Sequence, residues 1–253
     1  METLNYEYAT DLTRRLTKGT SPCLLDYGCG AGEIVEKAIA AGFDAYGVEE
    51  FYEGGSYRED AKKTGILGTR IFELKNGIIP FPAEKFDVVI SNQVFEHIDD
   101  FSLPLSEISR VLKPSGIFIN IFPSAEVWRE GHIGIPFAHW FPKGLKARLF
   151  YVLPLRMLGM GYHKGVRSAN EWTLSQLEWI DKWTYYKPLF QIEKTFQRHF
   201  TITFYEADYI LFRLKRHPLL SQLSRLLEAN IFRPFLQFVC AKFASRVFVL
   251  KKR

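Results

Sequence analysis

Residues 23–33 read Cys23-Leu24-Leu25-Asp26-Tyr27-Gly28-Cys29-Gly30-Ala31-Gly32-Glu33. The apolar pair Leu24-Leu25 predicts a short buried strand, and a helix is expected after the loop, running to about Ala40. Three glycines at alternate positions allow the backbone to turn sharply and to lie close against a ligand, because they carry no Cβ. The segment therefore predicts a strand, a glycine-rich loop and a helix whose first N–H groups face that ligand.

Acidic residues around this loop narrow the class of ligand. A dinucleotide-binding fingerprint has its third glycine at position 33, which here is Glu33, and no P-loop lysine follows the turn. Carboxylates at Asp26 and Glu33 suit an ammonium group better than a pyrophosphate. A second strand is expected at residues 44–49, and the carboxylate of Glu49 at its end can accept hydrogen bonds from both hydroxyls of a ribose.

Three later stretches complete a pattern with this loop: Gly47-Val48-Glu49, Phe86-Asp87-Val88-Val89-Ile90-Ser91-Asn92-Gln93-Val94-Phe95-Glu96-His97-Ile98 and Ile108-Ser109-Arg110-Val111-Leu112-Lys113-Pro114-Ser115-Gly116. In this order and spacing they resemble the class I S-adenosylmethionine (SAM)-dependent methyltransferases over roughly residues 20–124. The resemblance implies SAM as the cofactor. It implies a cofactor site made of Asp26, Gly28, Cys29, Gly30, Gly32, Glu49, Asn92 and Gln93.

Strands and helices alternate along the first half of the chain, which predicts an α/β fold with a doubly wound, mostly parallel sheet. The family pattern implies seven strands with the last one antiparallel. We expect one domain over residues 1–253, with a helical and loop insertion at 125–200 that covers the substrate and a basic amphipathic helical insertion at 213–245. The expected elements include helices at 4–18 and 54–64, strands at 70–74, 87–90, 117–122, 200–209 and 246–250, and a helical pair at 218–244 interrupted at Pro234.

Two histidines are candidate general bases for methyl transfer to oxygen. His97 follows the fourth strand and could act as the base or bond to backbone groups. His132 lies in a Gly-, Pro- and aromatic-rich segment where relatives build substrate pockets, and the same two alternatives hold for it; His139 is a weaker candidate. No metal ligand cluster is evident from the spacing, so no metal site is expected.

Three details extend this interpretation. Tyr6 or Tyr8 on the first helix could cap the cofactor, or that helix could simply pack. Relatives often place an acid after the third strand to meet the adenine, and here Asn76 is the alternative. A capping-box spacing at 173–176 predicts a helix start, and Trp179, Trp183, Tyr186 and Phe190 form a helical stripe that is expected to be core.

Composition bounds the class of protein. The chain has 253 residues, of which 47% are hydrophobic, enough for one large core. The three cysteines form no pairs at the spacing of a disulfide framework or a zinc site. This argues against both and indicates a reducing compartment. The N-terminus lacks a secretory pattern and no apolar run is long enough to span a bilayer, so a cytoplasmic protein is expected.

Two stretches mix cations with apolar residues. Residues 143–167 hold six Lys or Arg and no acid, and residues 213–253 hold ten against one acid, Glu228. Such segments suit an interfacial helix on an anionic membrane, which would present a lipid-linked substrate, or they are a lid whose charges are solvated. A nucleic-acid substrate is disfavoured because no RNA-binding module is evident.

The expected function is therefore transfer of a methyl group from SAM to a small-molecule or lipid-linked acceptor, at oxygen. The alternatives are an RNA methyltransferase and a non-catalytic SAM-binding scaffold protein. The intact glycine loop, Asp26 and Glu49 argue against the scaffold, because a scaffold needs none of them. The sequence sets neither the acceptor nor the oligomeric state.

Overall fold

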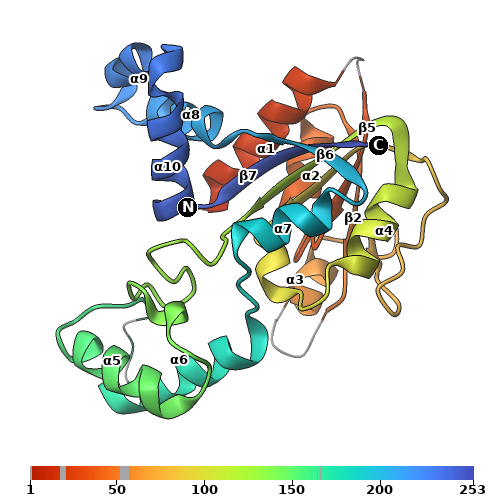
Figure 1. The fold of residues 1–253 in the computed structure, drawn as a ribbon. Coiled ribbons are helices and arrows are strands. Elements are labelled where there is room, and N and C mark those ends of the chain that lie inside the picture. The colour runs from red at the N-terminus through yellow and green to blue at the C-terminus, as the bar shows by residue number, and fades with distance from the viewer. Residues whose placement is uncertain (1, 18–20, 52–56, 164, 166) are drawn as a thin grey trace.

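The computed structural model describes residues 2–17, 21–51, 57–163, 165 and 167–253. Within them, seven strands form one sheet in the order β3-β2-β1-β4-β5-β7-β6 (Figure 1). The strands are β1 (Cys23–Tyr27), β2 (Asp44–Glu49), β3 (Ile71–Glu73), β4 (Phe86–Asn92), β5 (Leu112–Phe122), β6 (Phe200–Phe204) and β7 (Arg246–Lys252). Only β7 runs antiparallel to its neighbours, which confirms the predicted fold class.

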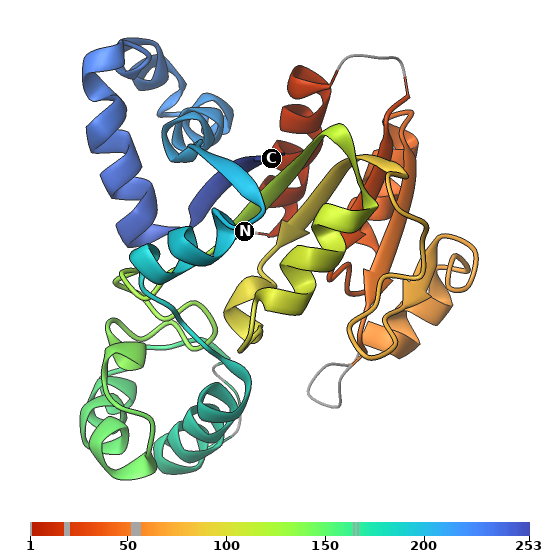
Figure 2. The ribbon, with the colours of Figure 1, turned by 45° about the vertical axis from the view of Figure 1, so that its right-hand side comes forward.

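Helices lie on both faces of the sheet (Figure 2). They are α1 (Glu2–Leu16), α2 (Glu33–Ala40), α3 (Tyr57–Lys63), α4 (Ser102–Val111), α5 (Leu145–Met157), α6 (Ala169–Trp183), α7 (Leu189–Phe196), α8 (Glu206–Arg216), α9 (Ser221–Leu227) and α10 (Arg233–Phe243). Short 3-10 turns occupy Phe95–His97, Ala138–Trp140 and Asn230–Phe232. Residue 18 and residues 54–56 of the predicted helices, like Lys164 of the basic stretch, lie outside the described residues.

Two hydrophobic cores hold the layers together. Buried side chains of α1, α2, α8 and α10 pack on one face of the sheet, and those of α4 and α7 pack on the other. The chain runs from β1 outward to β3 and then returns to β4, so β1 and β4 flank the point where the strand order reverses. In sheets of this kind the carboxyl ends of the strands at the reversal form the ligand crevice.

The segment between β5 and α7 has a small core of its own. Helices α5 and α6 pack with the preceding loop around Ile133, Val152, Trp172 and Leu177. In both ribbon views this lobe and the α8–α10 lobe project from the same side of the sheet (Figures 1 and 2). The lobe of α5 and α6 is tied to the end of β4 by a backbone hydrogen bond from Tyr185 to Glu96 of 2.7 Å.

Several predicted boundaries were wrong. The strand expected over 200–209 ends at Phe204, and α8 begins at Glu206. The misassignment arose because the run of apolar residues continues into the buried stripe of α8, where Tyr209 and Phe212 face the core. Pro234 does not interrupt a helix: it occupies the first turn of α10, where its missing N–H costs nothing.

Helix α6 begins earlier than predicted. Its cap is Ser168, whose hydroxyl accepts from the backbone N–H of Glu171 while the Glu171 carboxylate accepts from the N–H of Ser168. The same spacing at 173–176 is interior to the helix. The aromatic stripe is also not one helical face, because α6 ends at Trp183 and Phe190 is an exposed residue of α7.

Candidate active site

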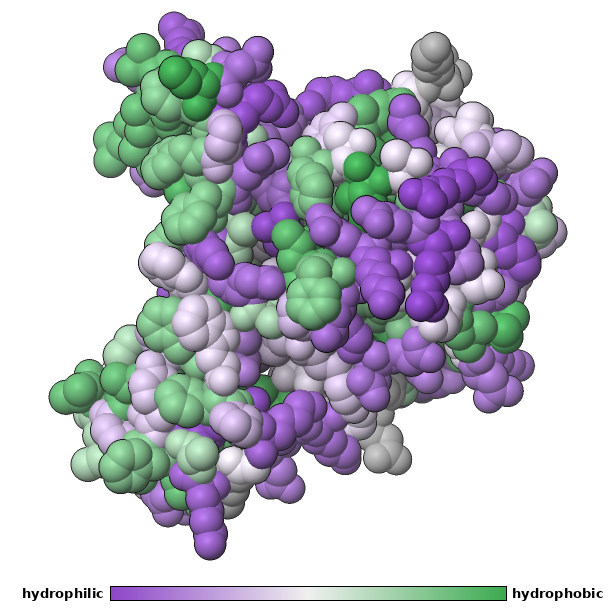
Figure 3. Space-filling view, in the orientation of Figure 1, coloured by the Kyte–Doolittle hydropathy of each residue, from purple (hydrophilic) through white to green (hydrophobic). Residues whose placement is uncertain are grey.

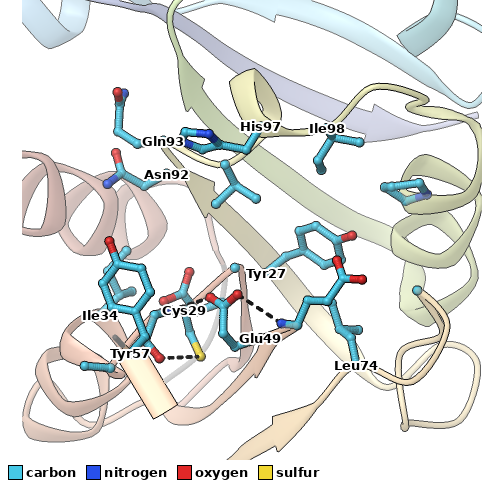
Figure 4. A pocket seen from close by; sticks show the side chains of 18 of the residues that line it. Tyr27, Cys29, Ile34, Glu49, Tyr57, Leu74, Asn92, Gln93, His97 and Ile98 are labelled. Carbon is cyan, nitrogen blue, oxygen red and sulfur yellow. Dashed lines mark hydrogen bonds between the residues drawn. The ribbon is translucent and has the colours of Figure 1, made fainter. Parts of the chain in front are cut away.

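A cavity of about 680 Å³ lies at the carboxyl ends of β1, β2 and β4 (Figure 4). It brings together eight of the ten predicted site residues: Asp26, Gly28, Cys29, Gly30, Glu49, Asn92, Gln93 and His97. Figure 4 shows Asn92, Gln93 and His97 at one end of the cavity and Cys29, Glu49 and Leu74 at the other. The remaining two, Gly32 and His132, do not line this cavity.

The glycine loop is shaped as much by packing as by access to a ligand. Gly28, Gly30 and Gly32 all have positive φ angles, of 79°, 55° and 98°. A Cβ at Gly28 would lie 2.3 Å from a methyl of Val94, and one at Gly32 would lie 2.4 Å from a methyl of Ile71. A Cβ at Gly30 would meet only ordinary contact, with the Tyr57 ring at 3.4 Å, so packing against the rest of the chain does not explain this glycine.

Glu49 is held at the end of β2 with its carboxylate in the cavity. Its two oxygens accept from the backbone N–H of Gly30 at 2.7 Å and of Glu50 at 3.0 Å. Burial raises the pKa of Glu49, although these backbone donors oppose the shift. Each oxygen keeps a further lone pair, so the carboxylate can still accept hydrogen bonds from two hydroxyls of a ligand.

Asp26 is the least satisfied group of the cavity. It is 1% exposed, and its Oδ1 has no hydrogen-bond partner in the described structure. Burial, reinforced by the nearby charge of Glu49, raises the pKa of Asp26 well above its usual value. A buried carboxylate in this state is stabilised by a cationic donor, which an ammonium group of a ligand would supply.

Asn92 and Gln93, at the end of the cavity opposite Glu49, form hydrogen bonds with residues far away in the sequence. The Asn92 Oδ1 accepts from Asn5 of α1 at 3.1 Å. Gln93 adopts a left-handed conformation with φ of 57°, and its side-chain amide donates to Ser245 at 3.1 Å. Helix α1 thus covers the cavity, and Tyr6 lines it; Tyr8 is buried in the core and donates to Asp208.

The two candidate bases face each other. The Nε2 atoms of His97 and His132 are 3.3 Å apart. The Nδ1 of His97 is 2.7 Å from the carbonyl oxygen of Trp183, and the Nδ1 of His132 is 2.7 Å from the carboxylate of Glu130. Because both of those oxygens accept, each Nδ1 carries a hydrogen, and a ring that is neutral therefore presents the lone pair of its Nε2.

The ionisable side chains in and around the histidine pair are largely buried, and burial shifts their pKa values. Burial lowers the pKa of His97 to about 4 and raises that of Glu96 to about 7. Burial by itself also lowers the pKa of His132, but its hydrogen bond to the charged Glu130 outweighs this and the net shift is upward. The phenol of Tyr186 donates to the same Glu130 oxygen at 2.6 Å, which secures that carboxylate.

A second hollow, of about 840 Å³, adjoins the first. It is lined by residues of the α5–α6 lobe, including His132, Tyr162, Trp172 and Trp179, and Tyr57 lines both hollows. The Trp179 ring packs against His132 at a centroid distance of 5.1 Å. The histidine pair therefore stands between a cavity with polar ends and an aromatic hollow.

Three residues of this region were not predicted from the sequence: Glu96, Glu130 and Tyr186. Glu96 was named only as the neighbour of His97, and a buried Glu has no signature of its own. Other secondary candidates lie elsewhere. His139 packs on Tyr186 and lines neither hollow, and Asn76 does not line the cavity although Leu74 and Gly77 do.

Known proteins are similar to this chain in both sequence and fold. Residues 25–120 match the family model described as a methyltransferase domain. The chain is 29% identical over 147 residues to a ubiquinone biosynthesis O-methyltransferase of Paramagnetospirillum magneticum, covering 56% of this chain and 58% of that protein. The protein of the same name from Bartonella tribocorum is 27% identical over 135 residues, covering 48% and 50%. The chain thus spans about half the length of the curated relatives it matches.

Solved structures resemble nearly the whole chain in fold, although their sequences differ widely from it. An S-adenosylmethionine-dependent methyltransferase from Mesorhizobium loti has a TM-score of 0.55 at 15% identity, covering 98% of this chain and 100% of that one. A putative one from Listeria monocytogenes has the same TM-score at 14% identity, covering 99% of each. Residues 25–120 are therefore similar to a methyltransferase domain, and the chain has the Rossmann-like fold of these S-adenosylmethionine-dependent methyltransferase structures.

Proposed function

We propose that the protein transfers the methyl group of SAM to a hydroxyl of a small-molecule or lipid-linked acceptor. The observation that carries the proposal is the buried carboxylate of Asp26, whose Oδ1 has no partner among the described residues, in a cavity with Glu49 at one end and His97 at the other. The curated relatives that match the chain are named as O-methyltransferases, which supports oxygen as the acceptor atom.

The residues of the cavity fit SAM by their donor and acceptor types. Glu49 would accept from the ribose hydroxyls, and Asp26 would accept from the ammonium group of the methionine part. The room left at Gly30 allows the cofactor to approach the backbone. Asn92 and Gln93 would lie beside the methionine end.

Bound SAM supplies a methyl group on a positively charged sulfur, which an oxygen nucleophile can displace in line. The protein's part is to hold that oxygen at near-attack distance and to exclude water. The aromatic hollow beside His132 would hold the acceptor. The facing Nε2 atoms would take up the hydroxyl proton, because their Nδ1 atoms are committed to Trp183 and Glu130.

Label transfer tests this function directly. Protein incubated with methyl-labelled SAM and a total lipid extract is expected to move label into the organic phase at a rate proportional to enzyme concentration. Label that stays with SAM, for the lipid extract and for a panel of water-soluble phenols alike, would contradict the proposal. The phenol panel separates a soluble acceptor from a lipid-linked one.

We also propose that the α9–α10 surface docks on an anionic membrane. It exposes Leu226, Ile231, Phe235 and Phe238, each at least half exposed, and Figure 3 shows apolar colour gathered over this lobe. Arg225, Arg233 and Lys242 lie on the same helices. Apolar side chains among cations suit the headgroup region of an anionic bilayer. None of the described helices meets the length and hydropathy of a transmembrane span.

Vesicle sedimentation tests the docking surface. The parent protein is expected to sediment with phosphatidylglycerol vesicles and to be released by salt, because the attraction of the cations is screened. A Leu226→Ser, Ile231→Ser, Phe235→Ser triple variant is expected to bind at least ten-fold less. The control Ile39→Ser changes an exposed apolar residue of α2 and should leave binding unchanged. Equal binding by the triple variant would contradict the assignment.

A further inference from the structure

The facing Nε2 atoms of His97 and His132 need a positive charge between them, either a proton or a metal ion. Two bare Nε2 lone pairs 3.3 Å apart repel each other unless a cation lies between them. Their tautomers are fixed from behind, by the Trp183 carbonyl on His97 and by Glu130 on His132. A neutral ring cannot present a hydrogen at Nε2 without giving up its buried partner, so the space between the two Nε2 atoms takes either an added proton or a metal ion.

Glu96 adds an independent observation. Its side chain is 1% exposed, and neither carboxylate oxygen has a hydrogen-bond partner among the described residues. One of these oxygens and a ring nitrogen from each histidine all lie within 4.8 Å of one another. A buried carboxylate without donors is costly, so its placement beside two lone pairs points to a missing positive charge.

We propose that Glu96, His97 and His132 bind a divalent transition-metal ion, with Zn²⁺ as the best-suited probe. Two nitrogens bound tetrahedrally at 2.0–2.1 Å stand roughly 3.3 Å apart, which is the separation of the two Nε2 atoms here. Glu96, with an oxygen within 4.8 Å of a nitrogen of each ring, would supply the third ligand. Two histidines and one carboxylate with a fourth position open form a ligand set that catalytic zinc ions use.

The groups behind the ligands match what a metal site requires. Histidine ligands almost always donate their other ring N–H to a carboxylate or a carbonyl, which orients the ring and raises its basicity. Glu130 and the Trp183 carbonyl do so here, and Tyr186 in turn donates to Glu130. Tyr186 and Glu130 are thus positioning residues. Glu130 precedes α5 in the chain, and Tyr186 follows α6.

The open position would face the acceptor. His97 lines the cofactor cavity and His132 lines the aromatic hollow, so an ion between them borders both. With both Nε2 atoms bound to the ion, the ion would take over the role of the base: a hydroxyl bound there would lose its proton to solvent more readily, and the oxygen–methyl bond would form as the sulfur–methyl bond breaks. This role rests on the proposed function, whereas metal binding itself does not.

The test uses the full chain, stripped with EDTA and then dialysed. Calorimetric titration with Zn²⁺ is expected to show one ion per chain with micromolar or tighter affinity. Co²⁺ as a second probe is expected to give visible absorption bands of a tetrahedral nitrogen and oxygen site, without the near-ultraviolet thiolate band that Cys23, Cys29 or Cys240 would produce. Glu96→Gln, His97→Gln and His132→Gln are each expected to weaken binding at least 100-fold.

His217→Gln serves as the control, because His217 lies after α8 and outside both hollows. Thermal unfolding of every variant shows which ones are folded. The inference would be overturned if the folded parent does not bind one ion per chain, or if binding survives all three ligand substitutions. A proton shared between the two rings would then remain as the explanation of their contact. SAM is titrated into the same metal-free samples, so failure of the metal site and failure of cofactor binding are read separately.

Discussion

The His97→Gln variant is expected to transfer methyl groups about 10²–10⁴-fold more slowly than the parent, which is the range for loss of a positioned general base. Glutamine keeps an amide that can bond to the Trp183 carbonyl, so the fold around the site is retained while the facing lone pair is lost. The measurement is the initial rate of label transfer from SAM to the acceptor that the lipid and phenol assays identify.

The affinity of this variant for SAM separates a chemical role from a structural one. His97 lies at the end of the cavity opposite Glu49, so the dissociation constant is expected to change less than about five-fold. His139→Gln is the matched control, because His139 lies nearby but lines neither hollow. An unchanged rate in His97→Gln would contradict the role assigned to the pair. Both a proton and a metal ion between the rings predict the same loss, and the Zn²⁺ titration distinguishes them.

The Asp26→Asn variant is expected to be more stable than the parent and to bind SAM more weakly. In the free protein the Asp26 carboxylate is buried and partly unpaired, so a neutral side chain of the same shape removes a cost. In the complex the carboxylate is the proposed partner of the ammonium group. Hydrogen bonds between charged groups contribute about 1.5–3 kcal/mol, so the affinity for SAM is expected to fall by about 10- to 100-fold.

The stability difference between Asp26→Asn and the parent should depend on pH with a definite sign. The pKa of Asp26 is raised in the folded state, so folding favours the protonated carboxyl. The contribution of Asp26 to stability is therefore fully present below its ordinary pKa, near 4, and is lost as the pH rises through the raised pKa. The asparagine variant has no such loss, and its relative stability should increase from about pH 4 upward.

Urea unfolding at several pH values and calorimetric titration with SAM check the two halves of this prediction. Asp44→Asn, at the other end of β2 and outside the cavity, is the control and should leave SAM affinity unchanged. Parent-like affinity in Asp26→Asn would remove Asp26 from the site. A pH-independent stability difference would show that its carboxyl is not perturbed.

The parallel half of the fold could be predicted from sequence because its signals are local. The apolar run before Gly28, the glycine spacing and the acid that ends the second strand occupy short windows, and each maps onto one strand or loop. The reasons for the glycines were only partly predictable. Contacts of Gly28 with Val94 and of Gly32 with Ile71 join segments far apart in the chain, so no window of sequence contains them.

The histidine site could not be predicted as a unit. His97 and His132 were each recognisable as candidates, but their pairing depends on how the α5–α6 lobe docks at the end of β4. Tyr186 was assigned to a helical stripe, and its role depends on α6 ending at Trp183. The burial that makes Glu96 distinctive is likewise a property of the tertiary structure.

Calorimetric titration of the purified protein with SAM, and with S-adenosylhomocysteine, tests the central claim that the cavity beside the glycine loop binds this cofactor. One molecule per chain with micromolar affinity is expected for both ligands, and binding of both should weaken in Asp26→Asn. Absence of binding of either ligand to a sample that unfolds cooperatively on heating would contradict the account, because the fold would then be present without its cofactor.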